Sequence, residues 1–137
     1  MAEGFFGELA DQVGYPFNQM PIEAFTSAAG GYGQATLCGS IGVAATCIGS
    51  VTDVKTSKKL IAELSKWYKQ EKFPNYQPEG LGLPQTVAES VLCEKSVGKF
   101  MEVSGFVYDS PERKSRCASV AGEVVKKMVE LLNAELA

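Results

Sequence analysis

The sequence predicts an all-α fold: a compact single-domain bundle of about five to six helices, with a glycine-rich loop before a buried central helix. Three stretches carry this prediction. Residues 56–70 have the spacing of an amphipathic helix, residues 110–112 have the composition of a helix start, and residues 33–51 are small or apolar on every side. A chain of 137 residues has the length of one ordinary domain, so we expect residues 1–137 to form a single unit.

The first half of the chain leads into the helix that we expect at the centre of the bundle. Residues 15–21 contain two X-Pro pairs, which favour extended chain, and a short helix is expected over residues 22–29. The run Gly33–Val51 carries no charged residue, which is typical of a helix surrounded by others. The glycines at its start permit positive φ angles and close backbone approach, so this stretch can hold a thiol among free peptide N–H groups.

Two further helices are predicted on either side of a loop. In Thr56–Gln70 apolar residues recur at helical spacing, and Thr56 or Ser57 is the expected cap. Residues 73–83 are rich in proline and glycine, which indicates a surface loop. Helix is expected to resume at Pro84 and to run through Cys93 toward Val103, because Thr86 and Glu89 have the spacing of a capping box.

The clearest helix start lies near the C-terminus. Ser110, Pro111 and Glu112 are the residue types preferred at the first positions of a helix, and the pattern continues to Leu136. The face expected to pack into the core carries Cys117, Ala121, Val124, Met128 and Leu131.

Composition excludes several classes of function. The net charge of −3 argues against a nucleic-acid-binding protein, and no stretch is apolar and long enough to span a bilayer. Residues 1–14 lack the basic start and apolar run of a signal peptide, so we expect a soluble protein of unknown compartment: periplasmic if a leader was removed, and otherwise cytoplasmic. Aromatic residues near the start could serve a homodimer contact, although they could equally line the edge of the core.

Histidine is absent, which restricts the chemistry further. No Ser-His or Cys-His pair, imidazole zinc site, histidine haem ligand or Cys-x-x-Cys-His haem attachment can form. The four cysteines are Cys38, Cys47, Cys93 and Cys117, and none are close neighbours in sequence. They could be ordinary buried side chains, disulfide or dithiol partners, or ligands of a metal or cluster, and their spacing does not choose among these.

Several motifs in order carry a family resemblance. The run GGYGQATLCGSIGVA resembles the glycine loop and Cys-Gly-Ala signature of the C-GCAxxG-C-C family of redox-active proteins, especially its branch similar to split-Soret cytochrome c. Upstream, YPFNQMP matches that branch. Downstream, LIAELSKWY, FPNYQP, LPQTVAESVLCEKSV, ERKSRC and VVKKMVELLN follow in the same order, so the resemblance covers residues 15–133 or thereabouts.

The resemblance implies a helical redox domain whose spaced cysteines hold an iron–sulfur centre, of the 2Fe-2S type in the split-Soret branch. Carried over by position, Cys38, Cys93 and Cys117 are the implied metal ligands. We expect N–H groups of Gly30, Gly31, Gly33 and Gly39 to face such an anionic centre, and these glycines could instead only let helices touch.

The chain differs from the family pattern at the positions where a fourth ligand of the cluster would be expected. Relatives often place histidine after the cysteine where this chain has Glu94, and Trp-Cys where it has Phe100-Met101. The haem-attachment region is missing, so we expect no haem. Cys47 would lie on the opposite helical face from Cys38. The fourth ligand could be an oxygen of Glu94 or a thiol from another subunit, or the centre could have been lost.

Three functions therefore stay open at this point. The first is electron transfer through an iron–sulfur centre to a redox partner protein, which makes the chain more of an electron carrier than an enzyme with its own substrate. The second is thiol–disulfide redox chemistry, which needs an exposed thiol of low pKa. The third is a helical interaction domain with inert buried cysteines.

Overall fold

Five α-helices make up most of the computed structural model, which describes residues 1–137. They are α1 (Ala2–Val13), α2 (Gly39–Val51), α3 (Val54–Gln70), α4 (Cys93–Ser104) and α5 (Pro111–Leu136). Short 3₁₀ turns span Phe17–Gln19 and Ile22–Ala28, and a π-type turn spans Gly31–Ala35. Strands β1 (Lys72–Phe73) and β2 (Thr86–Val87) form a small antiparallel pair, Lys72 opposite Val87 and Phe73 opposite Thr86. The predicted all-α fold is confirmed.

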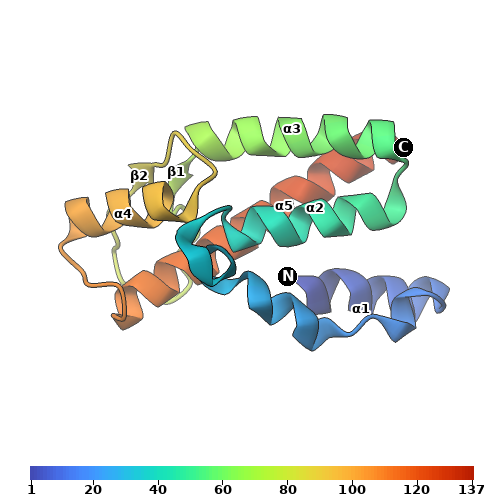
Figure 1. The fold of residues 1–137 in the computed structure, drawn as a ribbon, viewed down its shortest axis with the longest axis horizontal. Helices are drawn as coiled ribbons and strands as arrows, with labels where there is room; N and C mark the ends of the chain where they lie inside the picture. Colours follow the sequence, from blue (N-terminus) through green and yellow to red (C-terminus); the bar gives the residue numbers. More distant parts are fainter.

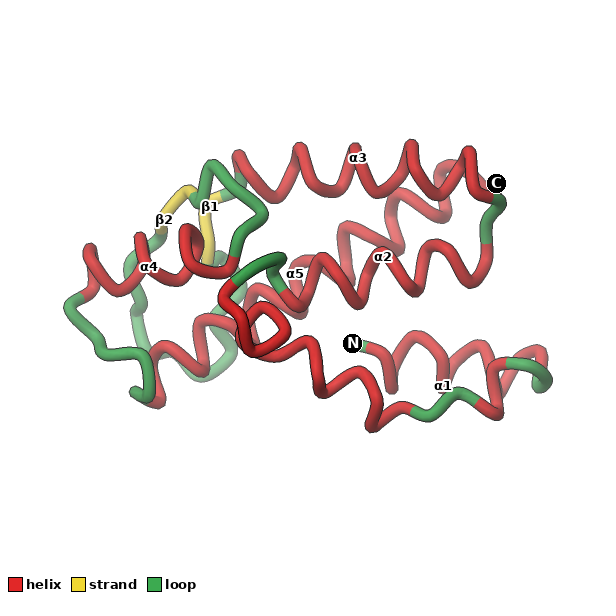
Figure 2. The backbone as a smooth tube through the Cα atoms, viewed as in Figure 1, coloured by secondary structure: helices red, strands yellow, loops and turns green.

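Helices α2, α3 and α5 form the body of the bundle. Figure 1 shows them running alongside one another, with α4 at one end and α1 beside α2 toward the other. Contacts join α2 to α3, α2 to α5 and α3 to α5, so each helix of this trio packs on the other two. Figure 2 shows that the two short strands lie at the α4 end, where most of the non-helical chain also gathers.

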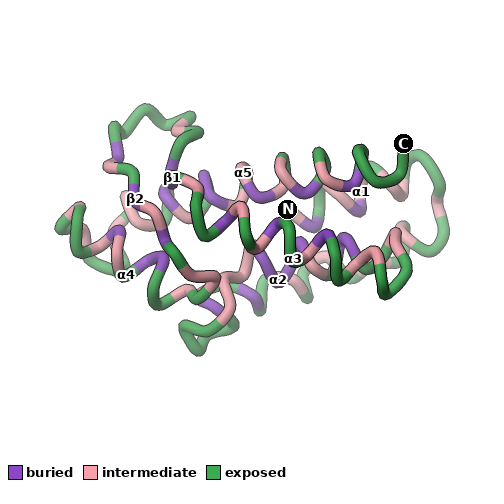
Figure 3. Tube along the Cα trace, turned by 90° about the horizontal axis from the view of Figure 1, so that it is seen from above, coloured by how far each residue is buried: buried purple, intermediate pink, exposed green.

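The core lies between these three helices. Ile41, Ala44 and Ile48 of α2 are at most 2% exposed, and they pack with Leu64 of α3 and Val124 of α5, which are fully buried. Buried stretches alternate with exposed ones along the helices in Figure 3, as amphipathic helices around one core require. Helix α2 is buried over much of its length, as predicted for a central helix, but it begins only at Gly39 and keeps one exposed face. Residues 33–38, which the sequence predicts to be helical, form the end of the π-type turn and the bridge that precedes α2.

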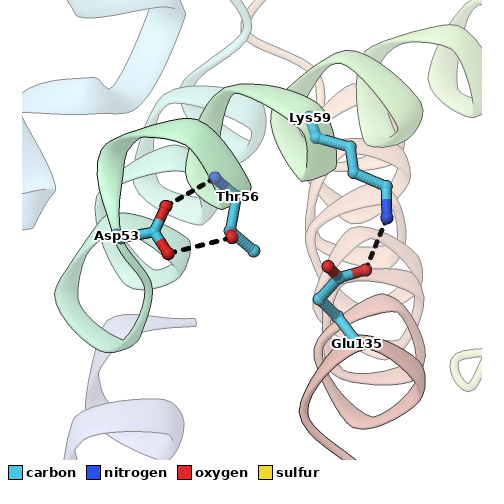
Figure 4. Close-up of polar contacts among 4 residues, drawn as sticks. All are labelled: Asp53, Thr56, Lys59 and Glu135. Carbon is cyan, nitrogen blue, oxygen red and sulfur yellow. Dashed lines mark hydrogen bonds and ion pairs between the residues drawn. The ribbon is translucent and has the colours of Figure 1, made fainter.

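Helix α3 begins two residues earlier than the sequence indicates. Its cap is Asp53, not Thr56 or Ser57: a carboxylate oxygen of Asp53 accepts a hydrogen bond from the Thr56 N–H at 2.8 Å, and the other accepts from the Thr56 hydroxyl at 3.2 Å (Figure 4). Figure 4 also shows the Lys59–Glu135 ion pair, 2.6 Å between nitrogen and oxygen, which joins α3 to the end of α5.

The predicted helix from Pro84 is wrong over its first nine residues. Thr86 and Val87 form β2, and Glu89 has a positive φ of 58°, so no capping box forms. Pairing with β1 and the hydrogen bond from the Glu89 N–H to the Lys69 carbonyl hold this stretch against the end of α3. Helix α4 starts only at Cys93 and then continues without a break through Gly98.

Helix α5 starts where the sequence predicts. The Ser110 hydroxyl accepts a hydrogen bond from the Arg113 N–H at 3.2 Å, and Pro111 follows in the first turn. The buried face is shifted slightly from the predicted stripe: Val124 and Met128 are fully buried, whereas Cys117, Ala121 and Leu131 are only partly buried. No helix is both long and apolar enough to cross a bilayer.

Candidate metal centre

Cys38 and Cys93 lie next to each other because the segments that precede their helices pair. Leu37 and Leu92 form an antiparallel bridge, the Cys38 N–H donates to the Val91 carbonyl at 2.8 Å, and the Cys93 N–H donates to the Thr36 carbonyl at 2.6 Å. Cys38 is the N-cap of α2 and Cys93 is the first residue of α4. Both sulfurs therefore sit at the positive ends of helix dipoles, which favour negative charge.

The glycine loop fits against this pair without room for side chains. A Cβ on Gly31, whose φ is +59°, would lie 2.7 Å from the Cβ of Cys93 and 2.7 Å from the Thr36 nitrogen. A Cβ on Gly39 would overlap the Ala28 carbonyl oxygen. At these two positions glycine has a packing reason, since its absence of a side chain lets the loop reach the start of α4 and lets α2 reach the 3₁₀ turn before it.

Cys117 approaches from α5 between two arginines. Its sulfur lies 3.9 Å from the Arg113 Nη1 and 3.8 Å from the Arg116 Nη1. The Arg113 guanidinium stacks 4.1 Å above the ring of Tyr108 and also donates from Nε to the Tyr108 carbonyl.

The three cysteines line one cavity of about 390 Å³. Most of the lining is hydrophobic, contributed by the N-terminus, the 3₁₀ turn, α2, α4 and α5, with Met1, Phe25, Val43, Val97 and Val120 among the apolar residues. Three thiols from three helices thus line one largely apolar hollow, and an apolar lining is what shields a metal centre from water.

Arg116 is the unusual member of this cavity. Its side chain is 1% exposed, and no carboxylate pairs with it. Nη2 donates to the Ser96 hydroxyl at 2.7 Å, and the Tyr68 hydroxyl donates to the same oxygen at 2.9 Å. The buried Nε has no hydrogen-bond partner. A buried charge without a counter-charge is costly, so this guanidinium leaves a positive site that an anion in the cavity would neutralise.

The pKa values of Cys93 and Tyr68 are both raised, and neighbouring thiols are among the causes. Burial raises the pKa of the Cys93 thiol, and the Cys38 and Cys117 thiols raise it further while the arginines lower it. Burial also raises the pKa of Tyr68, with the Cys38 thiol as the next cause. A bound metal cation would favour the ionised form of Cys93, because metals bind the thiolate.

The other sequence-predicted residues are distributed unevenly. Gly30, Gly31 and Gly39 line the cavity, whereas Gly33 lines a second, outer hollow together with Glu94 and Met101; Gly30 and Cys93 border both spaces. Cys47 is fully buried in the core away from the cavity, and burial raises its pKa to about 11, which makes it an inert thiol. All four cysteines are free.

Sequence reasoning missed Arg116, Ser96 and Tyr68. A signal for Arg116 was present, because it precedes Val120 and Val124 by one and two helical turns and so shares their buried face. The pairing of Ser96 with Tyr68 joins α4 to α3 and follows from no local pattern.

The spacing of the donor side chains bears on which metal group could bind. No group of three or more cysteine, aspartate or glutamate side chains lies close enough together to hold one metal ion. The ligands of a two-iron cluster are divided between two iron atoms, so as a set they span a wider space than the ligands of one ion. Three soft thiols, a shielding apolar wall and an unpaired buried cation together fit an anionic iron–sulfur centre.

Comparison with known proteins identifies a redox-active family. Residues 2–131 match the family described as "Putative redox-active protein (C_GCAxxG_C_C)". The chain is 28% identical over 137 residues to split-Soret cytochrome c of Desulfovibrio desulfuricans, with 95% of this chain and 49% of the relative covered.

A solved structure of that cytochrome superposes closely. It is described as containing a novel iron centre, and it matches with a TM-score of 0.89 at 27% identity, covering 98% of this chain and 61% of the other. The chain thus spans about half the length of the curated relative.

Proposed function

Because the chain belongs to the C_GCAxxG_C_C family, we propose that it is an electron-transfer protein whose Cys38, Cys93 and Cys117 hold an iron–sulfur centre. The observation that carries the proposal is the cavity, in which three thiols from α2, α4 and α5 face a buried arginine that lacks an anionic partner. The iron centre described for the relative of the same fold supports iron as the metal.

The residues that line the cavity would have different roles in holding the centre. The paired segments before α2 and α4 fix the spacing of Cys38 and Cys93, and α5 brings Cys117 to them. Apolar side chains such as Phe25 and Val120 would limit the access of water to the centre. When bound, the centre supplies reversible one-electron oxidation and reduction, which the surrounding N–H groups and charges tune.

We propose a 2Fe-2S centre with an incomplete set of protein thiols. This chain supplies no fourth cysteine to the cavity, because Cys47 is buried elsewhere in the core. The Glu94 carboxylate lines the outer hollow that Cys93 borders, and the Glu3 carboxylate lines the cavity itself, so both are candidate oxygen ligands from this chain. We propose that no haem is bound, since the sequence has neither histidine nor a Cys-x-x-Cys-His motif. The electron would pass to or from a redox partner protein.

Thiol–disulfide chemistry is the second candidate, because three free thiols share one cavity. The two functions differ in colour and in the number of electrons. Protein purified without oxygen should absorb in the visible range and should bleach reversibly on addition of one electron per chain. A colourless protein that takes up two electrons per chain would support the dithiol instead, and a colourless protein without redox activity would indicate an interaction domain with inert cysteines.

A further inference from the structure

We propose that Arg116 is a fixed buried charge that raises the redox potential of the centre, and that Arg113, at the same distance from Cys117, contributes much less. This inference rests on the proposed function and identifies the residue that sets the redox potential of the proposed centre. The two arginines lie 3.8 and 3.9 Å from the Cys117 sulfur, so distance alone does not distinguish them.

Burial distinguishes the two arginines. Arg116 is 1% exposed, whereas Arg113 is partly exposed and stacks on Tyr108, which is itself 45% exposed. The interaction between two charges varies inversely with the local dielectric constant, and water beside Arg113 screens its charge. The same guanidinium therefore acts more strongly on a cavity occupant from position 116 than from position 113.

Arg116 is also held in one place. Its Nη2 donates to the Ser96 hydroxyl at 2.7 Å and lies 3.4 Å from the Ser96 carbonyl oxygen, and the guanidinium lies 5.6 Å from the ring centroid of Phe100. Tyr68, fully buried, donates to the same hydroxyl. The charge is thus preorganised toward the cavity and needs no rearrangement when an electron arrives.

The direction of the effect follows from charge. Reduction of the centre by one electron adds one negative charge to the cavity, and a fixed positive charge stabilises the reduced form more than the oxidised form. Removing the Arg116 charge should lower the equilibrium constant for reduction by at least about tenfold, or ~59 mV for a one-electron couple. Removing Arg113 should change it by less than about threefold.

The iron-free protein should become more stable when the Arg116 charge is removed. In that state the Arg116 charge is buried with no carboxylate partner, and such a charge destabilises the folded protein. Arg116→Met keeps most of the side-chain volume and leaves Ser96 bonded to Tyr68. We therefore expect the iron-free Arg116→Met protein to unfold at a higher temperature than the iron-free wild type. If Arg116 served only to hold the fold together, its replacement would lower the unfolding temperature instead.

The test compares Arg116→Met, Arg116→Lys and Arg113→Met with the wild type. Midpoint potentials are measured by dithionite titration of the iron-loaded proteins, with dithionite as the electron donor, and unfolding temperatures are measured on the iron-free proteins. We expect the potential to fall in Arg116→Met, to be largely retained in Arg116→Lys because the charge is kept, and to be nearly unchanged in Arg113→Met.

Two results would overturn the proposal. One is an equilibrium constant for reduction in Arg116→Met that stays within about threefold of the wild-type value. The other is an equal fall of the midpoint potential in Arg116→Met and in Arg113→Met. If Arg116→Met does not fold without iron, the arginine is a structural anchor and the proposal is likewise overturned. Failure of the proposed function would look different, since the wild type itself would then bind no iron.

Discussion

A single methyl group on Gly31 tests whether the glycine loop positions Cys93. Gly31 has a φ of +59°, and a Cβ there would lie 2.7 Å from the Cβ of Cys93 and 2.7 Å from the Thr36 nitrogen. The left-handed conformation costs an alanine about 1–2 kcal/mol, and overpacking costs roughly 1–3 kcal/mol more. Gly31→Ala should therefore lower the free energy of unfolding by about 2–5 kcal/mol, which for a domain of this size is a fall in Tm of at least about 6 °C.

Gly33→Ala is the matched control. Gly33 has a similar φ of +68°, but a Cβ there would meet nothing within 4 Å, so only the backbone cost of about 1–2 kcal/mol applies. Thermal unfolding followed by circular dichroism measures both changes, and iron analysis of protein purified without oxygen measures the consequence for the site. We expect Gly31→Ala to lose iron, because Cys93 must move, and Gly33→Ala to keep it. Equal losses of stability and equal iron in the two variants would refute the steric argument.

Two other changes probe the core and a helix start. Ser110→Ala removes the side-chain oxygen that accepts from the Arg113 N–H and should lower the free energy of unfolding by about 1 kcal/mol, measured by urea titration; no loss would mean that water replaces the cap. Burial raises the pKa of Cys47 from 9.0 to about 11, so its contribution to stability is present below pH 9 and is lost as the pH rises to 11. This loss should be roughly 2–3 kcal/mol, and it should be absent in Cys47→Ala. The same dependence on pH in both proteins would contradict this assignment.

The fold class follows from the sequence because its main signals are local. The amphipathic spacing of residues 56–70 and the Ser110-Pro111 start are properties of single helices, and both helices form in these places. The helix predicted from Pro84 fails for the complementary reason. Its first residues satisfy hydrogen bonds with β1 and with the end of α3, and a capping-box spacing carries no information about these distant partners.

The candidate site, like the fold, could be predicted from the sequence only in part. The resemblance to a known family supplied the three cysteines, and their packing around one cavity depends on the Leu37–Leu92 bridge, which pairs residues far apart in sequence. Arg116 has an ordinary place in a helical pattern, but its lack of an anionic partner emerges only from the packing of α4 and α5 around it.

Iron and acid-labile sulfide per chain, measured on protein purified without oxygen, test the central claim most directly. The wild type should contain about two of each. Cys38→Ala, Cys93→Ala and Cys117→Ala should each lose most of both, and Cys47→Ala should retain them, because Cys47 lies in the core outside the cavity. Iron that is absent from the wild type, or that survives in all four variants alike, would contradict the assignment of this cavity as an iron–sulfur site.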